Sequence, residues 1–140
     1  MIYTTYFAQL RNLPTNIIPI SICRFPPKWF RGLEYLKLAP LWSTLKRWKD
    51  GAKDYSAAQE YMQDFYEKVL SPLSVVRVLD EIQMSIPDEI KVKMQSPVWR
   101  NNEWHVALVC YEKPNDFCHR HLVSQWLQDS GYECKEWTKD

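Results

Sequence analysis

The chain has 140 residues, of which 46% are hydrophobic and 25% charged, and its formal net charge is +1. This length suits one domain, residues 1–140, with a core of its own, and the composition excludes a disordered chain. A net charge near zero also excludes a protein whose overall field attracts nucleic acid, so any polyanion has to be bound by a local patch.

The cysteines and the apolar segments indicate a cytoplasmic protein. Four cysteines without a Cys-x-x-Cys pair are too few for a disulfide scaffold and are typical of free thiols. Residues 1–6 lack the basic region and the apolar run of a signal peptide. The apolar windows are all shorter than the roughly 20 residues of a membrane-spanning helix, so we expect no membrane partner.

The first part of the chain predicts two strands. Residues 2–7 are rich in β-branched and aromatic residues and predict the first strand, and residues 8–13 allow one or two helical turns. Residues 16–23 predict a second strand, whose continuous apolar character is typical of a strand covered on both faces. Pro19 lacks an amide hydrogen, so we expect the neighbouring strand on that side to be absent or displaced.

A loop that mixes cations with aromatic rings follows the second strand. Residues 23–32 contain two prolines and interleave three cations with three aromatics. A nucleotide or a single-stranded nucleic acid requires such a mixture, since phosphates meet cations and bases meet rings. A surface loop whose rings pack into the core has the same composition. Arg24 and Trp29 are our candidate ligand-binding residues, with Phe25 as an alternative stacking ring.

Three amphipathic helices are predicted next. The first has Pro40 in its first turn and ends at Gly51, and the second spans residues 54–70. The third has Ser71 as its N-cap and runs through Ile82. Cations near the end of the first helix complement its dipole, and they also offer a patch for nucleic acid. These cations are Lys46, Arg47, Lys49 and Lys53.

The region 85–103 has a mixed pattern. Residues 91–94 alternate like an edge strand, Pro97 interrupts, and residues 101–102 permit a turn. A buried strand over residues 106–111 follows, and then a polar loop.

The last part of the chain predicts a helix and a strand. The helix opens at Cys118 and ends before Gly131, and a final short strand covers residues 132–137. Strands separated by helices predict an α/β fold, a single three-layer domain with a small, mostly parallel sheet flanked by helices.

Ligands bind to such sheets beyond the carboxyl ends of the strands. The second strand ends at Cys23 and the strand over residues 106–111 ends near Cys110. If these strands are parallel, the loop over residues 23–32 and the start of the helix at Cys118 share one rim of the sheet.

The helix start supports two main kinds of chemistry. In the first, Cys118 is a thiolate nucleophile, His119 or His121 is the acid or base, and Glu112 orients one of them. In the second, the helix amides and Arg120 bind an anion while Cys118 is a small buried filler. A purely structural helix start is a further alternative.

A metal site is a weaker alternative. It would use Cys110, Cys118 and a histidine with Cys23, but this spacing matches no standard zinc pattern, and we expect no metal.

A family resemblance runs through most of the chain. Residues 108–114 and 117–123 resemble the signature of the uncharacterised bacterial and phage family called domain of unknown function 488. That signature is a strand ending in Cys-x-Glu-Lys, a short loop and Cys-His-Arg. Further similarities are Ser21-Ile22-Cys23, Trp29, Gly32, Tyr35, Leu38-Ala39-Pro40 and the opening at Tyr3 to Phe7.

The resemblance implies a small α/β domain and a location for its site. The implied site residues are Cys110, Glu112, Cys118, His119 and Arg120. The chain departs from the family pattern between Ile82 and His105, where we expect extra residues.

These observations predict a protein that binds, and in one version also processes, a nucleotide-like or other phosphorylated ligand. The alternatives are a non-enzymatic nucleotide-sequestering or protein-interaction module and a nucleic-acid-binding protein. The patterns specify no cofactor and no oligomeric state, and they leave open whether the protein is an enzyme. The candidate catalytic residues are Cys118, His119 and Glu112. The candidate ligand-binding residues are Arg120, Cys110, Cys23, Arg24, Trp29, Lys113 and Tyr3.

Overall fold

The computed structural model of the protein describes residues 1–94 and 105–139. In these residues a five-stranded sheet has the order β3-β2-β4-β1-β5, and the paired strands are all parallel. The predicted α/β fold with a small, mostly parallel sheet is therefore confirmed. The strands are β1 (Ile2–Tyr6), β2 (Ile18–Ser21), β3 (Leu33–Glu34), β4 (Val106–Cys110) and β5 (Cys134–Glu136).

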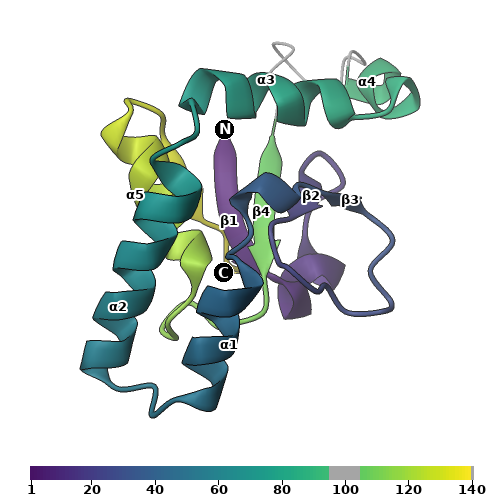
Figure 1. The fold of residues 1–140 in the computed structure, drawn as a ribbon. Helices are drawn as coiled ribbons and strands as arrows, with labels where there is room; N and C mark the ends of the chain where they lie inside the picture. Colours follow the sequence, from purple (N-terminus) through teal and green to yellow (C-terminus); the bar gives the residue numbers. More distant parts are fainter. Residues whose placement is uncertain (95–104, 140) are drawn as a thin grey trace.

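The pairing aligns the carboxyl ends of the central strands. β4 lies between β1 and β2, with Tyr6 opposite Cys110 and Ser21 opposite Val109. Figure 1 shows β1 and β4 side by side in the middle of the molecule. Because these strands run in one direction, the loops that follow β2 and β4 leave the sheet at the same rim, as the sequence predicted.

Pro19 lies in β2 at a point where the neighbouring strand on its side is absent from the described residues, as the sequence predicted. The amide of Ile18 donates to the carbonyl of His105 and that of Ile22 to Val109, so these residues bond toward β4. Neighbouring residues of a strand bond in alternate directions, and Pro19 therefore faces β3. The pairing with β3 begins only at Ile20, so Pro19 has no ladder partner there among the described residues.

The helices are mostly those that the hydrophobic pattern predicted. Figure 1 shows α1, α2 and α5 together over the sheet, with α3 across the end where the strands begin. Asp54 caps α2 by accepting from the amide of Ala57, and a π-helical segment extends α2 to Leu70. The segments are η1 (Phe7–Asn12), η2 (Leu36–Leu38), α1 (Trp42–Asp50), α2 (Tyr55–Phe65), η3 (Tyr66–Leu70), α3 (Val75–Ser85), α4 (Asp88–Met94) and α5 (His119–Asp129).

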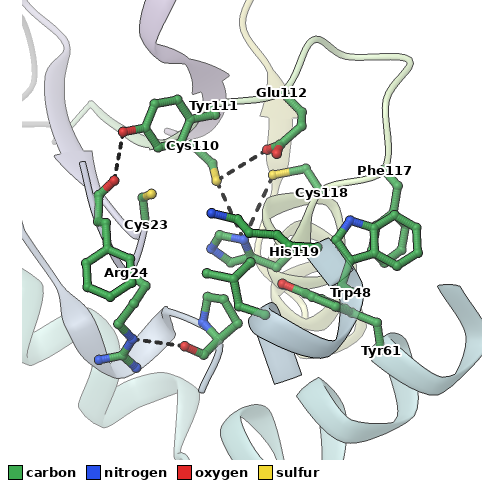
Figure 2. A pocket seen from close by; sticks show the side chains of 14 residues that line it. Cys23, Arg24, Trp48, Tyr61, Cys110, Tyr111, Glu112, Phe117, Cys118 and His119 are labelled. Atoms are coloured by element: carbon green, nitrogen blue, oxygen red, sulfur yellow. Dashed lines mark hydrogen bonds between the residues drawn. The ribbon is translucent and has the colours of Figure 1, made fainter. Parts of the chain in front are cut away.

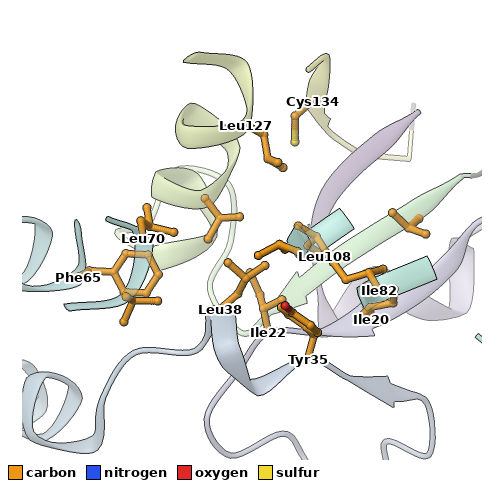
Figure 3. Packing of buried hydrophobic residues seen from close by; sticks show 14 of the residues in the cluster. Ile20, Ile22, Tyr35, Leu38, Phe65, Leu70, Ile82, Leu108, Leu127 and Cys134 are labelled. Atoms are coloured by element: carbon orange, nitrogen blue, oxygen red, sulfur yellow. The ribbon is translucent and has the colours of Figure 1, made fainter. Parts of the chain in front are cut away.

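The two faces of the sheet are covered differently. Ile20, Leu108 and Phe65 belong to the larger core, which lies between the sheet and the helices (Figure 3). The other face carries a smaller cluster around Phe7 and Val109, which is covered by η1 and the aromatic loop after β2. The third layer is thus formed by a 3₁₀ helix and a loop.

Three predicted elements differ from the structure. Pro40 was expected in the first turn of its helix, but it lies before Leu41, the N-cap residue of α1. The helix α3 begins later than predicted, because Ser74 rather than Ser71 is its N-cap and accepts from the amide of Arg77. Residues 91–94 were expected to form an edge strand but belong to α4. The carbonyl of Pro87 accepts hydrogen bonds from two amides in the first turn of α4. Acidic residues in the same turn complement the helix dipole.

The predicted interruption at Pro97 and the turn at residues 101–102 lie outside the described residues. Among the helices that the structure describes, none is both long enough and apolar enough to cross a membrane.

Candidate functional site

A cavity of about 380 Å³ lies at the carboxyl ends of β2 and β4 (Figure 2). The loop after β2, the start of α5 and the helices α1 and α2 all contribute to its wall. Thiols and an imidazole are contributed by Cys23, Cys110, Cys118 and His119, rings by Trp48, Tyr61 and Phe117, and charges by Arg24, Lys49 and Glu112.

Local structure explains why the thiols meet here. The amide of Ile22 donates to the carbonyl of Val109 at 3.1 Å and continues the pairing of β2 with β4 to the rim of the sheet. Cys110 is the last residue of β4, and Cys23 comes two residues after the end of β2. Cys118 has extended backbone as the N-cap residue of α5, which returns the chain to the same rim after the loop over residues 111–117.

His119 is held by a backbone carbonyl. Its Nε2 lies 2.7 Å from the oxygen of Ile22, and the residue is only 4% exposed. Because a carbonyl oxygen can only accept, Nε2 carries a proton, and Nδ1 of the neutral ring is the acceptor. The imidazole therefore presents a basic nitrogen to the thiols.

The thiols of Cys110 and Cys118 share this nitrogen. Nδ1 of His119 lies 3.6 Å from the sulfur of Cys110 and 3.9 Å from that of Cys118. Burial raises the pKa of Cys118. Hydrogen bonds with Cys110 and His119 and the charge of His119 lower it by more, so the net pKa lies well below its usual value. Burial alone would lower the pKa of His119, yet its contact with the Cys118 thiolate raises it. The arrangement favours a thiolate–imidazolium pair between Cys118 and His119.

The other two thiols have different states. The hydrogen bonds of Cys110 with Cys118 and Cys23 raise its pKa well above the usual value, and burial adds to this effect. The hydrogen bond with Cys110 lowers the pKa of Cys23. Cys110 is thus the thiol that holds its proton most strongly, whereas the lowered pKa of Cys118 and Cys23 favours their thiolate forms.

Glu112 lies at the edge of the thiol group. The sulfur of Cys110 donates to its Oε2 at 3.7 Å. Burial of the carboxyl, followed by the negative charge and hydrogen bond of Cys118, raises the pKa of Glu112. Glu112 is therefore a stronger proton acceptor than an ordinary carboxylate, and it is placed to accept and return a proton beside the thiols.

Aromatic rings form one wall of the cavity. The ring centroid of Phe117 lies 4.6 Å from that of Trp48 and 5.0 Å from that of Tyr61. Burial raises the pKa of Tyr61, so its hydroxyl stays neutral. The rings are inclined to one another, by 44° for Trp48 and Phe117 and by 86° for Tyr61 and Phe117, so the wall is apolar and a planar group can stack on one ring at a time.

Cations stand around the cavity. Arg24 is anchored by a hydrogen bond from its Nε to the carbonyl of Pro40 at 3.0 Å. Lys49 comes from the last turn of α1. The sequence interpretation assigned Lys49 to the helix dipole or to a nucleic-acid patch, and it gave Trp48, Tyr61 and Phe117 no part in the site. Phe117 directly precedes Cys118, so its proximity to that thiol could have been read from the sequence. The proximity of Trp48, Lys49 and Tyr61 to the thiols depends on tertiary packing, for which the local sequence gives no signal.

Arg120 lies away from the cavity. It is 0% exposed and forms a two-pronged ion pair with Glu136, Nε to Oε1 at 3.1 Å and Nη2 to Oε2 at 2.9 Å. Thr4 also donates to Oε1, and the guanidinium carbon lies 5.7 Å from the ring centroid of Tyr6. Nη1 is buried and finds no hydrogen-bond partner in the residues that the structure describes. The structure corrects the prediction that Arg120 holds a ligand in the cavity, because its charge is already paired inside the fold.

The remaining predicted residues fall into two groups. Cys23, Cys110, Cys118, His119, Glu112 and Arg24 line the cavity together with the alternative ring, Phe25. Trp29 is 60% exposed and packs edge-on against Phe7, Tyr3 packs in the smaller core cluster, and Lys113 is exposed in the loop after β4. These three lie outside the cavity.

A metal would find three donors here. The donor atoms of Cys110, Cys118 and His119 all lie within 4.8 Å of one another. Zinc takes thiolate and imidazole ligands of this kind, but its structural sites use four. The same three side chains are also suited to proton transfer.

The fold and the cavity define a class: an α/β domain with a cysteine–histidine cluster at the carboxyl end of its parallel sheet. A family model described as the active DUF488-N3 subclade matches residues 3–131. The match spans most of the chain, and the protein therefore belongs to the DUF488 family, as its signature residues indicated. A search of curated proteins and a search of solved structures find no match.

Proposed function

We propose that the protein is a thiol-dependent enzyme that binds a nucleotide-like or other phosphorylated ligand and processes it with Cys118. One observation carries this proposal: Nδ1 of His119 faces the thiols while Nε2 is fixed to the carbonyl of Ile22. An imidazole oriented in this way generates a thiolate at the wall of a cavity.

The reaction begins with proton transfer from Cys118 to Nδ1 of His119. The thiolate then attacks an electrophilic atom of the ligand, forming a bond to sulfur while the bond to the leaving group breaks. The electron pair goes to the leaving group, which takes the proton from His119. Water releases the product from Cys118, and Glu112 takes up a proton from that water.

The surroundings favour a ligand with a flat part and an anionic part. Trp48 and Phe117 offer a surface for stacking, while Arg24 and Lys49 supply positive charge. The amides at the start of α5 add partial positive charge close to Cys118. A volume of about 380 Å³ falls within the range of small-molecule sites.

The same site supports a cytoplasmic location, which is part of the proposal. All four cysteines are free, as expected for a protein in a reducing compartment. In an oxidising compartment a reactive thiol would be lost to oxidation.

Turnover tests the proposal directly. The protein is incubated with a library of nucleotides and sugar phosphates, and products are identified by mass spectrometry. We expect a product with the wild type and with Cys134→Ser, a thiol that lies on β5 away from the cavity, and none with Cys118→Ser. Turnover that persists in Cys118→Ser would overturn the nucleophile. A chelator included in one arm shows whether a bound metal is needed.

Recovery of an unchanged ligand would favour the non-enzymatic alternative. The nucleic-acid alternative relied on three cations of α1 and on Lys53 beyond its end, and two of these four have partners within the protein. Lys46 pairs with Asp50 at 2.7 Å, and Arg47 pairs with Glu60 and Asp64 at 2.9 and 2.8 Å. Binding that falls steeply as salt is raised would restore this alternative.

A further inference from the structure

The proposed reaction uses the thiol of Cys118 and leaves a second thiol beside it unexplained. Cys110 and Cys118 place their sulfur atoms within 4.8 Å of each other, and both lie near the same imidazole nitrogen. Both line the cavity, so a small reagent that enters it reaches both sulfurs. A nucleophilic thiolate with a protonated thiol next to it is the arrangement of a redox-sensitive pair.

We propose that a hydroperoxide oxidises Cys118 and that Cys110 then closes a reversible disulfide with it. This inference rests on the proposed function only in requiring that Cys118 be a nucleophilic thiolate. Its consequence is that oxidation removes the nucleophile and a thiol reductant restores it.

The first step consumes the hydroperoxide. The thiolate of Cys118 attacks the terminal oxygen, so that a sulfur–oxygen bond forms and the oxygen–oxygen bond breaks. The electron pair leaves with the alkoxide, or with hydroxide when the reagent is hydrogen peroxide, and His119 supplies the proton. Cys118 is oxidised to a sulfenic acid, and the peroxide is reduced to an alcohol or to water.

The second step uses the contact between Cys110 and Glu112. The carboxylate oxygen Oε2 accepts from the sulfur of Cys110 at 3.7 Å and can take its proton. The freed thiolate attacks the sulfur of the sulfenic acid, so that the disulfide forms and the sulfur–oxygen bond breaks. The departing hydroxide takes up a proton and leaves as water, which balances the proton lost by Cys110.

The chain between the two cysteines permits the closure. Cys110 is the last residue of the central strand, whereas Cys118 follows the loop over residues 111–117, most of which is exposed. A disulfide needs the sulfurs about 2 Å apart, so they must approach by less than about 3 Å. Movement of the exposed loop supplies this approach without displacing β4.

Cys134 is a matched control for this pair. It is as buried as the cavity thiols but lies opposite Ile2, at the other end of the sheet. Burial raises its pKa, which keeps it protonated and slow to oxidise.

The test treats the reduced full chain with hydrogen peroxide in slight excess and maps the cysteines by peptide mass spectrometry. In the wild type and in Cys134→Ser we expect a Cys110–Cys118 disulfide, which dithiothreitol reverses. In Cys110→Ser we expect Cys118 to stop at the sulfenic acid, which dimedone traps, and then to overoxidise. The wild-type map alone decides the pairing if a variant does not fold.

Two results would overturn the inference. One is a disulfide that includes Cys23 in place of Cys110 or Cys118, and the other is sulfinic acid at Cys118 in the wild type without any disulfide. Alkylation of the reduced protein with iodoacetamide separates these results from failure of the proposed function. Fast alkylation of Cys118 without a disulfide removes only this inference, whereas slow alkylation removes the nucleophile as well.

Discussion

His119 and Arg120 are adjacent in the sequence and equally hidden from solvent, yet they serve two different regions of the molecule. His119 faces the thiols of the cavity and shares its Nδ1 between two of them. Arg120 faces β1 and β5, where Glu136 and Thr4 complete an internal polar cluster. Successive residues of an α-helix point about 100° apart, which is enough to separate the two environments.

The two regions differ in whether the buried cationic side chain can gain or lose a proton. The guanidinium of Arg120 is permanently charged, and Glu136 compensates it at fixed geometry. The imidazole of His119 can exchange a proton with a neighbouring thiol, so its charge depends on chemistry in the cavity. One cluster therefore stabilises the fold, while the other is available for reaction.

The largest effect is expected from Arg120→Met. This change leaves the carboxylate of Glu136 without its charged partner in a site that is mostly hidden from solvent. Breaking a buried ion pair in this way costs about 3–5 kcal/mol, which denaturant unfolding will measure. Lys135→Met is the matched control, because its pair with Glu133 is exposed. A loss equal to that of the control would show that Arg120 is no structural anchor.

His119→Gln is expected to affect the cavity more than the fold. Without the imidazole the pKa of Cys118 returns toward that of an ordinary thiol, so the thiolate becomes a minority at neutral pH. We expect alkylation of Cys118 at pH 7 to slow by about tenfold or more. Unchanged alkylation would mean that His119 does not activate the thiol.

The pH dependence of Cys118 alkylation should differ between the wild type and His119→Gln. In the wild type the pKa of Cys118 lies well below its usual value, so the alkylation rate should level off at a lower pH than that of an ordinary thiol and fall on acidification through that lowered pKa. In His119→Gln the alkylation rate should instead keep rising as the pH is raised above neutral, because the pKa of Cys118 then lies closer to about 8.5, the pKa of an ordinary thiol. Profiles that coincide would place the cause of the lowered pKa elsewhere.

Lys49→Ala tests the ligand side of the cavity. Loss of a partly solvated charge is expected to weaken binding of a phosphorylated ligand by roughly threefold to tenfold, since tenfold corresponds to about 1.4 kcal/mol. Lys46→Ala lies on the same helix and outside the cavity, and its affinity should match that of the wild type in a calorimetric titration. Equal losses in both variants would indicate a diffuse charge effect.

The smallest effect is expected from Thr4→Val. The hydroxyl of Thr4 donates to Oε1 of Glu136 at 2.6 Å, but that oxygen also accepts from Arg120. Loss of one neutral donor costs about 1 kcal/mol in unfolding free energy. Alkylation of Cys118 should not change, and a change would show that the two regions are coupled.

The sequence predicted the position of the site because that position follows from local pattern. Apolar strands that end at Cys23 and Cys110 and a helix that opens at Cys118 are all readable along the chain. Parallel pairing then brings them to one rim without further information. The strand β3 escaped prediction because a two-residue segment has no periodicity to detect.

The orientation of Arg120 was also encoded, although the interpretation gave it a different role. Arg120, Val123 and Leu127 are spaced by three and four residues, which places them on one face of a helix, and all are at most 1% exposed. The partner Glu136 could not be predicted, because its contact with Arg120 depends on how β5 joins the sheet. Trp48 and Lys49 likewise reach the cavity only through the packing of α1.

The outermost strands limit how the sheet can meet another chain. A long exposed edge offers a row of unpaired backbone groups to which a foreign strand can add. Here β3 has two residues and β5 has three, and Pro19 removes a further donor where β3 has not yet begun. The longer strands lie inside the sheet, so the described edges offer little template for strand exchange or fibril growth.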